Sequence, residues 1–122
     1  MEQKRILIVD NEEDQLKIMK TILVKLGYEI ISAISAEEAE VLFQNQNFDL
    51  VITDLIMPEM DGIELCEKLK KTSPNTPVYG FSGHIELYED KKLERAGFDG
   101  FINKPISIDE LGHQIQLIFK QV

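Results

Sequence analysis

The 122-residue chain has almost no cysteine and no long apolar run. Its single cysteine, Cys66, cannot form an internal disulfide, which agrees with a reducing compartment. A membrane-spanning helix needs about 18 consecutive apolar residues, and no such stretch is present. The start of the chain also lacks the apolar stretch and small-residue cleavage site of a secretory signal. We therefore expect a cytoplasmic protein.

Basic residues are also scarce relative to acidic ones. The chain has 13 lysines and arginines against 22 aspartates and glutamates, a formal net charge of −9. Nucleic acid backbones and anionic membranes are bound by an excess of lysine and arginine, so we expect neither as a direct partner. No linker, repeat or low-complexity segment interrupts the sequence. Residues 1–122 are therefore predicted to form a single domain.

Apolar patterning alternates between strand and helix five times along the chain. The predicted strands are 5–10, 29–33, 50–53, 77–81 and 100–103. The predicted helices begin near Asp14, after Ser35, at Ile63, near Ile85 and after Ser107. Their apolar faces are expected at Leu16, Met19, Ile22, Leu23 and Leu26 in the first, Ala39, Leu42 and Phe43 in the second, Ile85, Tyr88, Leu93 and Ala96 in the fourth, and Ile108, Leu111, Ile115 and Ile118 in the fifth. This alternation predicts an α/β fold with a parallel sheet covered on two sides.

Polar side chains stand where four of the predicted strands end. Asp10 and Asn11 follow the first strand and Asp54 the third, whereas Ser82 follows the fourth and Lys104 the fifth. Ligands of an open parallel sheet bind beyond the carboxyl ends of its strands, so these residues should converge. The sequence therefore predicts a small site of two carboxylates, an amide, a hydroxyl and an ammonium.

The charges of this site indicate its chemistry. Asp10 and Asp54 repel each other in a partly buried site, and a hard divalent cation such as Mg²⁺ relieves that repulsion. Lys104 adds a positive charge suited to phosphate oxygens. A carboxylate can act as the nucleophile in phosphoryl transfer and form an aspartyl phosphate. The site is thus predicted to bind Mg²⁺ and a phosphoryl group beside Asp54.

The motifs ILIVDNE, TDLIMPEMDG, GFSGH and GFINKPIS resemble those of the receiver domains of two-component response regulators, over essentially the whole chain. The resemblance implies the flavodoxin-like (βα)5 fold of the chemotaxis receiver, with helices on both faces of a five-stranded parallel sheet in order 2-1-3-4-5. It also implies that Asp54 accepts a phosphoryl group from the phosphohistidine of a sensor histidine kinase or a histidine phosphotransfer protein.

The resemblance also implies roles for the neighbouring residues. Asp10 and Asn11 with Asp54 and the backbone carbonyl of Ile56 would hold Mg²⁺. Ser82 would be the switch hydroxyl, and Lys104 would bond a phosphoryl oxygen. Phe101 would be the aromatic switch that rotates between outward and inward states. Phosphorylation would then change the surface of the fourth helix, fifth strand and fifth helix, which signals to an output domain or partner and could support a phosphorylation-dependent homodimer.

Three positions modify these expectations. Asn11 stands where most such receivers have a second acid, so we predict weaker Mg²⁺ binding, partly compensated by Glu12. Ile56 and His84 lie two residues beyond Asp54 and Ser82, where the family tunes the lifetime of the phosphoryl group. Bulky Ile56 is expected to hinder an attacking water and to slow self-dephosphorylation.

Two other functions stay open from the sequence. A receiver-like interaction domain that works without phosphorylation is suggested by Asn11. A hydrolase using Asp54 as nucleophile is disfavoured, because Ile56 offers no general acid or base. The expected protein is a binding module that catalyses its own modification and not a turnover enzyme. Cys66 is expected to be a packing residue.

Overall fold

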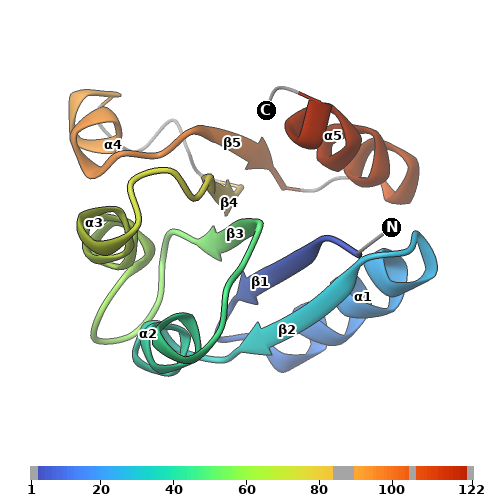
Figure 1. Ribbon diagram of the computed structural model, residues 1–122, viewed down its shortest axis with the longest axis horizontal. Helices are drawn as coiled ribbons and strands as arrows, with labels where there is room; N and C mark the ends of the chain where they lie inside the picture. Colours follow the sequence, from blue (N-terminus) through green and yellow to red (C-terminus); the bar gives the residue numbers. More distant parts are fainter. Residues whose placement is uncertain (1–2, 84–89, 105–106, 121–122) are drawn as a thin grey trace.

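A computed structural model describes residues 3–83, 90–104 and 107–120 (Figure 1). Within these residues, five strands and five helices alternate in sequence, as predicted. They are β1 Arg5–Val9, α1 Glu13–Lys25, β2 Glu29–Ala33, α2 Ala36–Asn45, β3 Leu50–Asp54, α3 Gly62–Thr72, β4 Val78–Ser82, α4 Asp90–Ala96, β5 Gly100–Asn103 and α5 Ile108–Lys120. No helix in these described ranges is long and apolar enough to cross a membrane.

The strands form one parallel sheet in the order β2-β1-β3-β4-β5, which confirms the predicted fold. In Figure 1, α1 and α5 cover one face of the sheet, and α2, α3 and α4 cover the other. Successive residues of a strand point to opposite faces, so each central strand supplies apolar side chains to two cores. Ile6 and Ile8 of β1 pack under α1 and α5, whereas Leu7 and Val9 pack under α2 and α3.

The helix ends follow the polar residues of the sequence. The Ser35 hydroxyl accepts a hydrogen bond from the backbone N–H of Glu38 at 3.1 Å, and the Ser107 hydroxyl accepts one from that of Glu110 at 3.1 Å. Gly27 and Gly97 take positive φ values of 99° and 97° just after α1 and α4. Side-chain caps satisfy the free N–H groups of a first turn, and left-handed glycines end helices without steric cost.

Two apolar positions differ from the prediction. Leu26 and Ile108 were expected on the buried faces of their helices, but they are 50% and 60% exposed. Leu26 directly follows α1 and Ile108 is the first residue of α5, so each stands at a helix end. The predicted helix residues Ile85 and Tyr88 lie outside the described residues.

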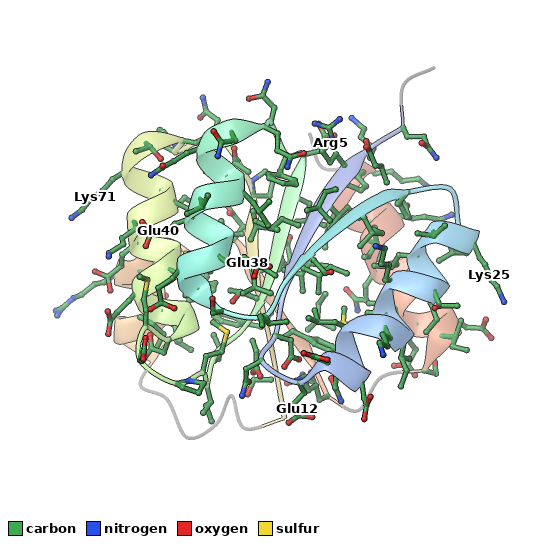
Figure 2. The ribbon with its side chains drawn as sticks, turned by 90° about the horizontal axis from the view of Figure 1, so that it is seen from below. Arg5, Glu12, Lys25, Glu38, Glu40 and Lys71 are labelled. Carbon is green, nitrogen blue, oxygen red and sulfur yellow. The ribbon has the colours of Figure 1, made fainter. Side chains whose placement is uncertain are left out.

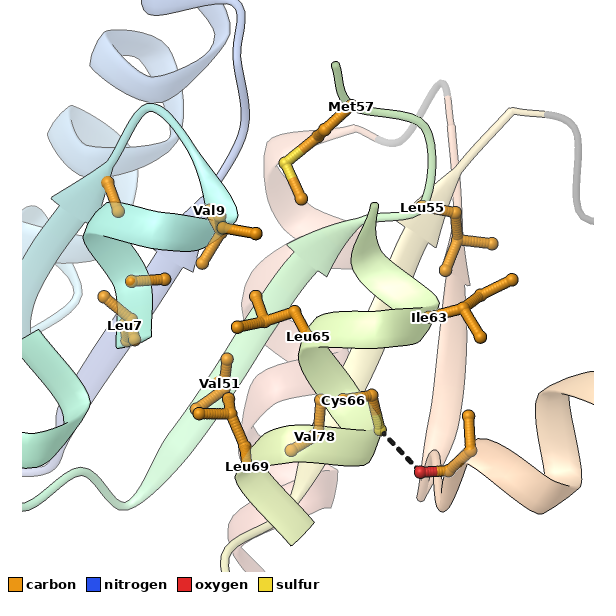
Figure 3. Packing of buried hydrophobic residues seen from close by; sticks show 14 of the residues in the cluster. Leu7, Val9, Val51, Leu55, Met57, Ile63, Leu65, Cys66, Leu69 and Val78 are labelled. Atoms are coloured by element: carbon orange, nitrogen blue, oxygen red, sulfur yellow. Dashed lines mark hydrogen bonds between the residues drawn. The ribbon is translucent and has the colours of Figure 1, made fainter. Parts of the chain in front are cut away.

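Figure 3 shows how the core on the α2–α4 face is filled around α3. Cys66 is fully buried there, and its thiol donates a hydrogen bond to the backbone carbonyl of Ala96 at 3.3 Å. Burial raises the pKa of the Cys66 thiol to about 12, so the thiol is held in its protonated, unreactive form. The expectation that Cys66 is a packing residue is confirmed.

Candidate functional site

The carboxyl ends of β1, β3, β4 and β5 bring the predicted site residues to one cleft of about 750 Å³. Its polar wall includes Asn11, Asp54, Ser82 and Lys104, and Ile56 stands at its edge. Asp10 lies beneath this wall, almost fully buried, one residue beyond the end of β1. Its backbone N–H still continues the sheet by donating to the carbonyl of Ala33 at 3.1 Å. The structure therefore brings together six of the residues that the sequence singled out.

The Lys104 ammonium joins the two carboxylates. Its Nζ lies 3.3 Å from Oδ2 of Asp10 and 3.6 Å from Oδ2 of Asp54. The lysine follows β5, and its backbone N–H donates to the carbonyl of Ser82 at 3.0 Å. Its Nζ also lies 5.0 Å from the ring centroid of Phe81, a cation–π contact that holds the side chain over β4.

Asp10 is fixed on both oxygens. Oδ2 faces Lys104, and Oδ1 accepts a hydrogen bond from the backbone N–H of Glu12 at 2.9 Å. This second bond shapes the turn between β1 and α1, and it turns Asn11 and Glu12 into the cleft. Figure 2 shows Glu12 at this end of β1, opposite to the end that begins with Arg5. Asp10 thus positions the residues that line the cleft as well as supplying charge.

Asp54 ends β3 with its carboxylate toward the cleft. Burial raises the pKa of this carboxyl above its ordinary value of 3.8. The Lys104 ammonium lowers the pKa, the neighbouring Asp10 carboxylate raises it, and backbone N–H groups of Ile56 and Leu55 lower it. Asp54 thus stands where desolvation disfavours its charged form, so a further positive group beside it would stabilise that charged form.

The loop after Asp54 is held by residues that sequence reasoning did not assign to the site. The backbone N–H of Gly62 donates to the carbonyl of Leu55 at 3.1 Å, and a Cβ on Gly62 would overlap the carbonyl oxygen of Asp54. Asp61 then caps α3 by accepting from the N–H of Glu64 at 2.9 Å. The sequence at Asp61-Gly62 predicts a turn and the start of a helix, and α3 does begin at Gly62. Gly62 must be a glycine because α3 begins in contact with the backbone of Asp54.

One predicted residue lies away from the cleft. Phe101 points to the α3–α4 face of the sheet and packs on that core, away from the cleft. His84 lies outside the described residues. Ser82 is buried and makes a contact of its own at the end of β4.

The donor set at the cleft fits a magnesium ion. Within the described part of the chain, no three histidine, cysteine, aspartate or glutamate side chains gather closely enough to hold a metal. Mg²⁺ is held by one or two carboxylates with water and phosphate oxygens, and does not need three acids. Asp54 and Asp10, the amide oxygen of Asn11 and the carbonyl of Ile56 could supply such a set. Their oxygens would share the cation's positive charge, as the two carboxylates now share that of Lys104.

Comparison with known proteins decides the family. The family model described as the response regulator receiver domain matches residues 6–116. This chain belongs to that family. It is therefore a receiver domain of the kind used in two-component systems, and its sheet order is that of its structural neighbours.

Two curated relatives illustrate which proteins this chain resembles. It is 33% identical over its whole length to the "Probable transcriptional regulator ycf27" of Porphyridium aerugineum, of which it covers 50%. It is 29% identical to the "Alkaline phosphatase synthesis transcriptional regulatory protein PhoP" of Bacillus subtilis, with 97% of this chain and 49% of the relative covered. The chain spans about half the length of these curated relatives.

Solved structures agree. A CheY-like receiver domain protein of Methanospirillum hungatei matches with a TM-score of 0.92 at 33% identity, covering 98% of this chain and 96% of the other. The chemotaxis protein CheY4 of Vibrio cholerae shares the fold, with a TM-score of 0.91 at 24% identity over 96% and 99% of the two chains.

Proposed function

We propose that this receiver domain accepts a phosphoryl group on Asp54 from the phosphohistidine of a sensor histidine kinase or a histidine phosphotransfer protein. The observation that carries the proposal is the Lys104 ammonium shared between Asp54 and Asp10 at the open cleft. An Asp54 oxygen would attack phosphorus, the bond from phosphorus to the imidazole nitrogen would break, and that nitrogen would take up a proton. The chain would modify itself once per signal and would not turn over a substrate.

The other groups of the cleft would act on the transferring group. Lys104 would neutralise a phosphoryl oxygen, and the Ser82 hydroxyl would donate to another. Asp10, Asn11, Asp54 and the carbonyl of Ile56 would hold Mg²⁺, which supplies charge neutralisation of the transferring phosphoryl group. Acceptance of the group would shift the α4-β5-α5 surface, and an output domain or partner would read that change. We propose that residues 1–122 act as one such domain in the cytoplasm.

Mass spectrometry of the intact protein tests this function. After incubation with Mg²⁺ and acetyl phosphate, the wild type should gain one phosphoryl group and Asp54→Ala none. Asp14→Ala, which removes an exposed aspartate of α1, is the matched control and should gain one like the wild type. An Asp54→Ala protein that gains the same mass would contradict the proposal, and continuous release of phosphate would indicate a hydrolase.

Ile56 should set how long the phosphoryl group persists. Ile56 is 54% exposed and lines the same cleft as Asp54. We expect Ile56→Asn to speed the loss of the phosphoryl group several-fold, because an amide can orient an attacking water that an isoleucine excludes. Decay of the phosphorylated protein after removal of the donor measures this. Unchanged decay would leave Ile56 without a role in phosphoryl lifetime.

A second function is favoured by Asn11, an amide where a further acid would add charge for a cation. Across the residues described by the structure, no three acids gather closely enough to hold a metal. With weak Mg²⁺ affinity, the same surface could bind a partner without phosphorylation. Partner binding that is equal for the wild type and Asp54→Ala, under conditions in which the wild type is phosphorylated, would support this function against the first.

A further inference from the structure

Gly80 occupies an unusual place for a glycine, in the middle of the buried strand β4. Glycine weakens a strand interior, and its presence there often marks the close approach of another group. It pairs with Thr53 on one side and with Phe101 on the other, so the three residues form one row across β3, β4 and β5. The group that approaches is the Phe101 ring.

The ring lies in the space that a side chain at residue 80 would need. A Cβ on Gly80 would be 2.7 Å from Cδ1 and 2.9 Å from Cε1 of Phe101, and 3.0 Å from Cδ2 of Leu55. Carbon atoms that are not bonded do not approach so closely, so even alanine would displace the ring or the leucine. Gly80 therefore provides a recess that the Phe101 ring fills.

This recess lies between the phosphoryl site and α4. Leu55 directly follows Asp54, and Ser82 is two residues from Gly80 on the same face of β4. On its other side the Phe101 ring contacts Phe98, with ring centroids 5.1 Å apart, and Phe98 follows the glycine that ends α4. A movement of the Phe101 ring would therefore change packing contacts both near the end of β4 and near the end of α4.

We propose that Gly80 is a positioning residue for the switch: it holds the Phe101 ring against the sheet before phosphorylation, so residue 80 sets the resting conformation of the α4–β5 surface. The part played in signalling rests on the proposed function, whereas the recess does not. In a chain with a larger residue 80, the ring would already rest away from the sheet, and phosphorylation would have a smaller change to produce.

Fluorine NMR of protein labelled with 3-fluorophenylalanine tests the recess. The chain has six phenylalanines, and the Phe101 resonance is the one lost in Phe101→Leu. In Gly80→Ala we expect the Phe101 resonance to move toward that of the free amino acid, while those of Phe43 and Phe48 stay in place. Gly83→Ala is the matched control, because among the residues that the structure describes its Cβ would meet only Lys104 atoms, at an ordinary 3.6 Å. A Phe101 resonance unmoved by Gly80→Ala would overturn the proposal.

Thermal unfolding separates positioning from a general loss of packing. Gly80→Ala should lower Tm in the wild type and lower it much less in a Phe101→Ala background, where no ring fills the recess. Equal losses in the two backgrounds would mean that the alanine clashes with something other than Phe101, and would overturn the proposal.

Beryllofluoride with Mg²⁺, a mimic of the phosphoryl group, tests the role in signalling. It should move the Phe101 resonance clearly in the wild type and less in Gly80→Ala, because the alanine keeps the ring out of the recess with or without the mimic. Equal movement in both proteins would overturn this role. If the mimic moves no resonance in either protein while Gly80→Ala still displaces Phe101, the proposed function fails and the recess stands.

Discussion

The two ends of the sheet hold lysines in different surroundings. At the amino ends of β4 and β5, Nζ of Lys70 lies 2.6 Å from Asp99 and 2.8 Å from the carbonyl of Thr76. The same Asp99 oxygen accepts from the backbone N–H of Val78 at 2.8 Å. At the carboxyl ends, Lys104 lies farther from its partners and is shared by two carboxylates.

The difference separates a structural cluster from a functional one. Lys70 and Asp99 balance each other, and their bonds close the start of β4 and β5. Lys104 with Asp10 and Asp54 leaves one negative charge uncompensated at the wall of a cleft. A site that is to receive a cation and then an anion needs such loose and unbalanced contacts, because tight ones would have to be broken first.

Replacing each lysine by methionine should show this division most strongly. Lys104→Met should slow phosphoryl incorporation from acetyl phosphate roughly 100-fold, the usual effect of removing one group that stabilises transition-state charge. Lys70→Met should leave the rate unchanged, since it lies at the opposite end of the sheet. The time course of mass gain at fixed Mg²⁺ measures both, and equal rates for the two variants would abolish the distinction.

The free energy of unfolding should instead depend on Lys70, at the amino ends of β4 and β5. Lys70→Met should lower the free energy of unfolding by about 1–3 kcal/mol, because it leaves Asp99 and the Thr76 carbonyl without their charged donor. Lys71→Met, the exposed lysine next to it on α3, should change it by less than about 0.5 kcal/mol (Figure 2). Urea unfolding measures both. A loss no greater for Lys70→Met than for Lys71→Met would show that the contacts of Lys70 with Asp99 and Thr76 do not add to the free energy of unfolding.

The sequence revealed one of these clusters and not the other for a physical reason. The carboxyl ends of parallel strands meet at one edge, so Asp10, Asp54 and Lys104 could be grouped from their places after apolar runs. Lys70 lies within a helix and Asp99 in a loop, and no general rule brings those positions together. Their contact depends on how α3 and the loop between α4 and β5 pack against the sheet.

Close approaches were likewise invisible before the fold was known. The contact of Gly62 with the Asp54 backbone and that of Gly80 with the Phe101 ring depend on distances of a few ångströms between elements. The exposure of Leu26 and Ile108 has the same origin, since periodicity predicts a face of a helix but not where the sheet beneath it stops. Strand order and site composition follow from patterns, whereas fit between elements does not.

The uncompensated charge of the Lys104 cluster should become a measurable cation affinity. Asn11→Asp adds a further negative charge at the wall of the cleft, so we expect Mg²⁺ to bind about tenfold more tightly. Asn75→Asp makes the same chemical change at an exposed turn far from the cleft and should have no effect. Titration with Mg²⁺ followed by calorimetry measures the affinities. Equal affinities for the wild type and Asn11→Asp would show that residue 11 does not face the ion.

The smallest effect should appear in the pH dependence of stability. The pKa of Asp54 is raised in the folded protein, first by burial, so the folded state holds this proton more tightly than the unfolded state. Between a pH of about 3.8 and the raised folded pKa, the unfolded state therefore binds fewer protons than the folded state, and stability falls as pH rises over that window.

Asp54→Asn cannot ionise and escapes this loss. Its Tm should match that of the wild type below the window, exceed it increasingly through the window, and stay above it at neutral pH. The same series with Asp14→Asn, an exposed aspartate, subtracts the general effect of removing one negative charge. A Tm difference that stays constant across the window would mean that Lys104 already offsets the burial of Asp54 in full, and the cluster at the cleft would then be as closed as the one at Lys70.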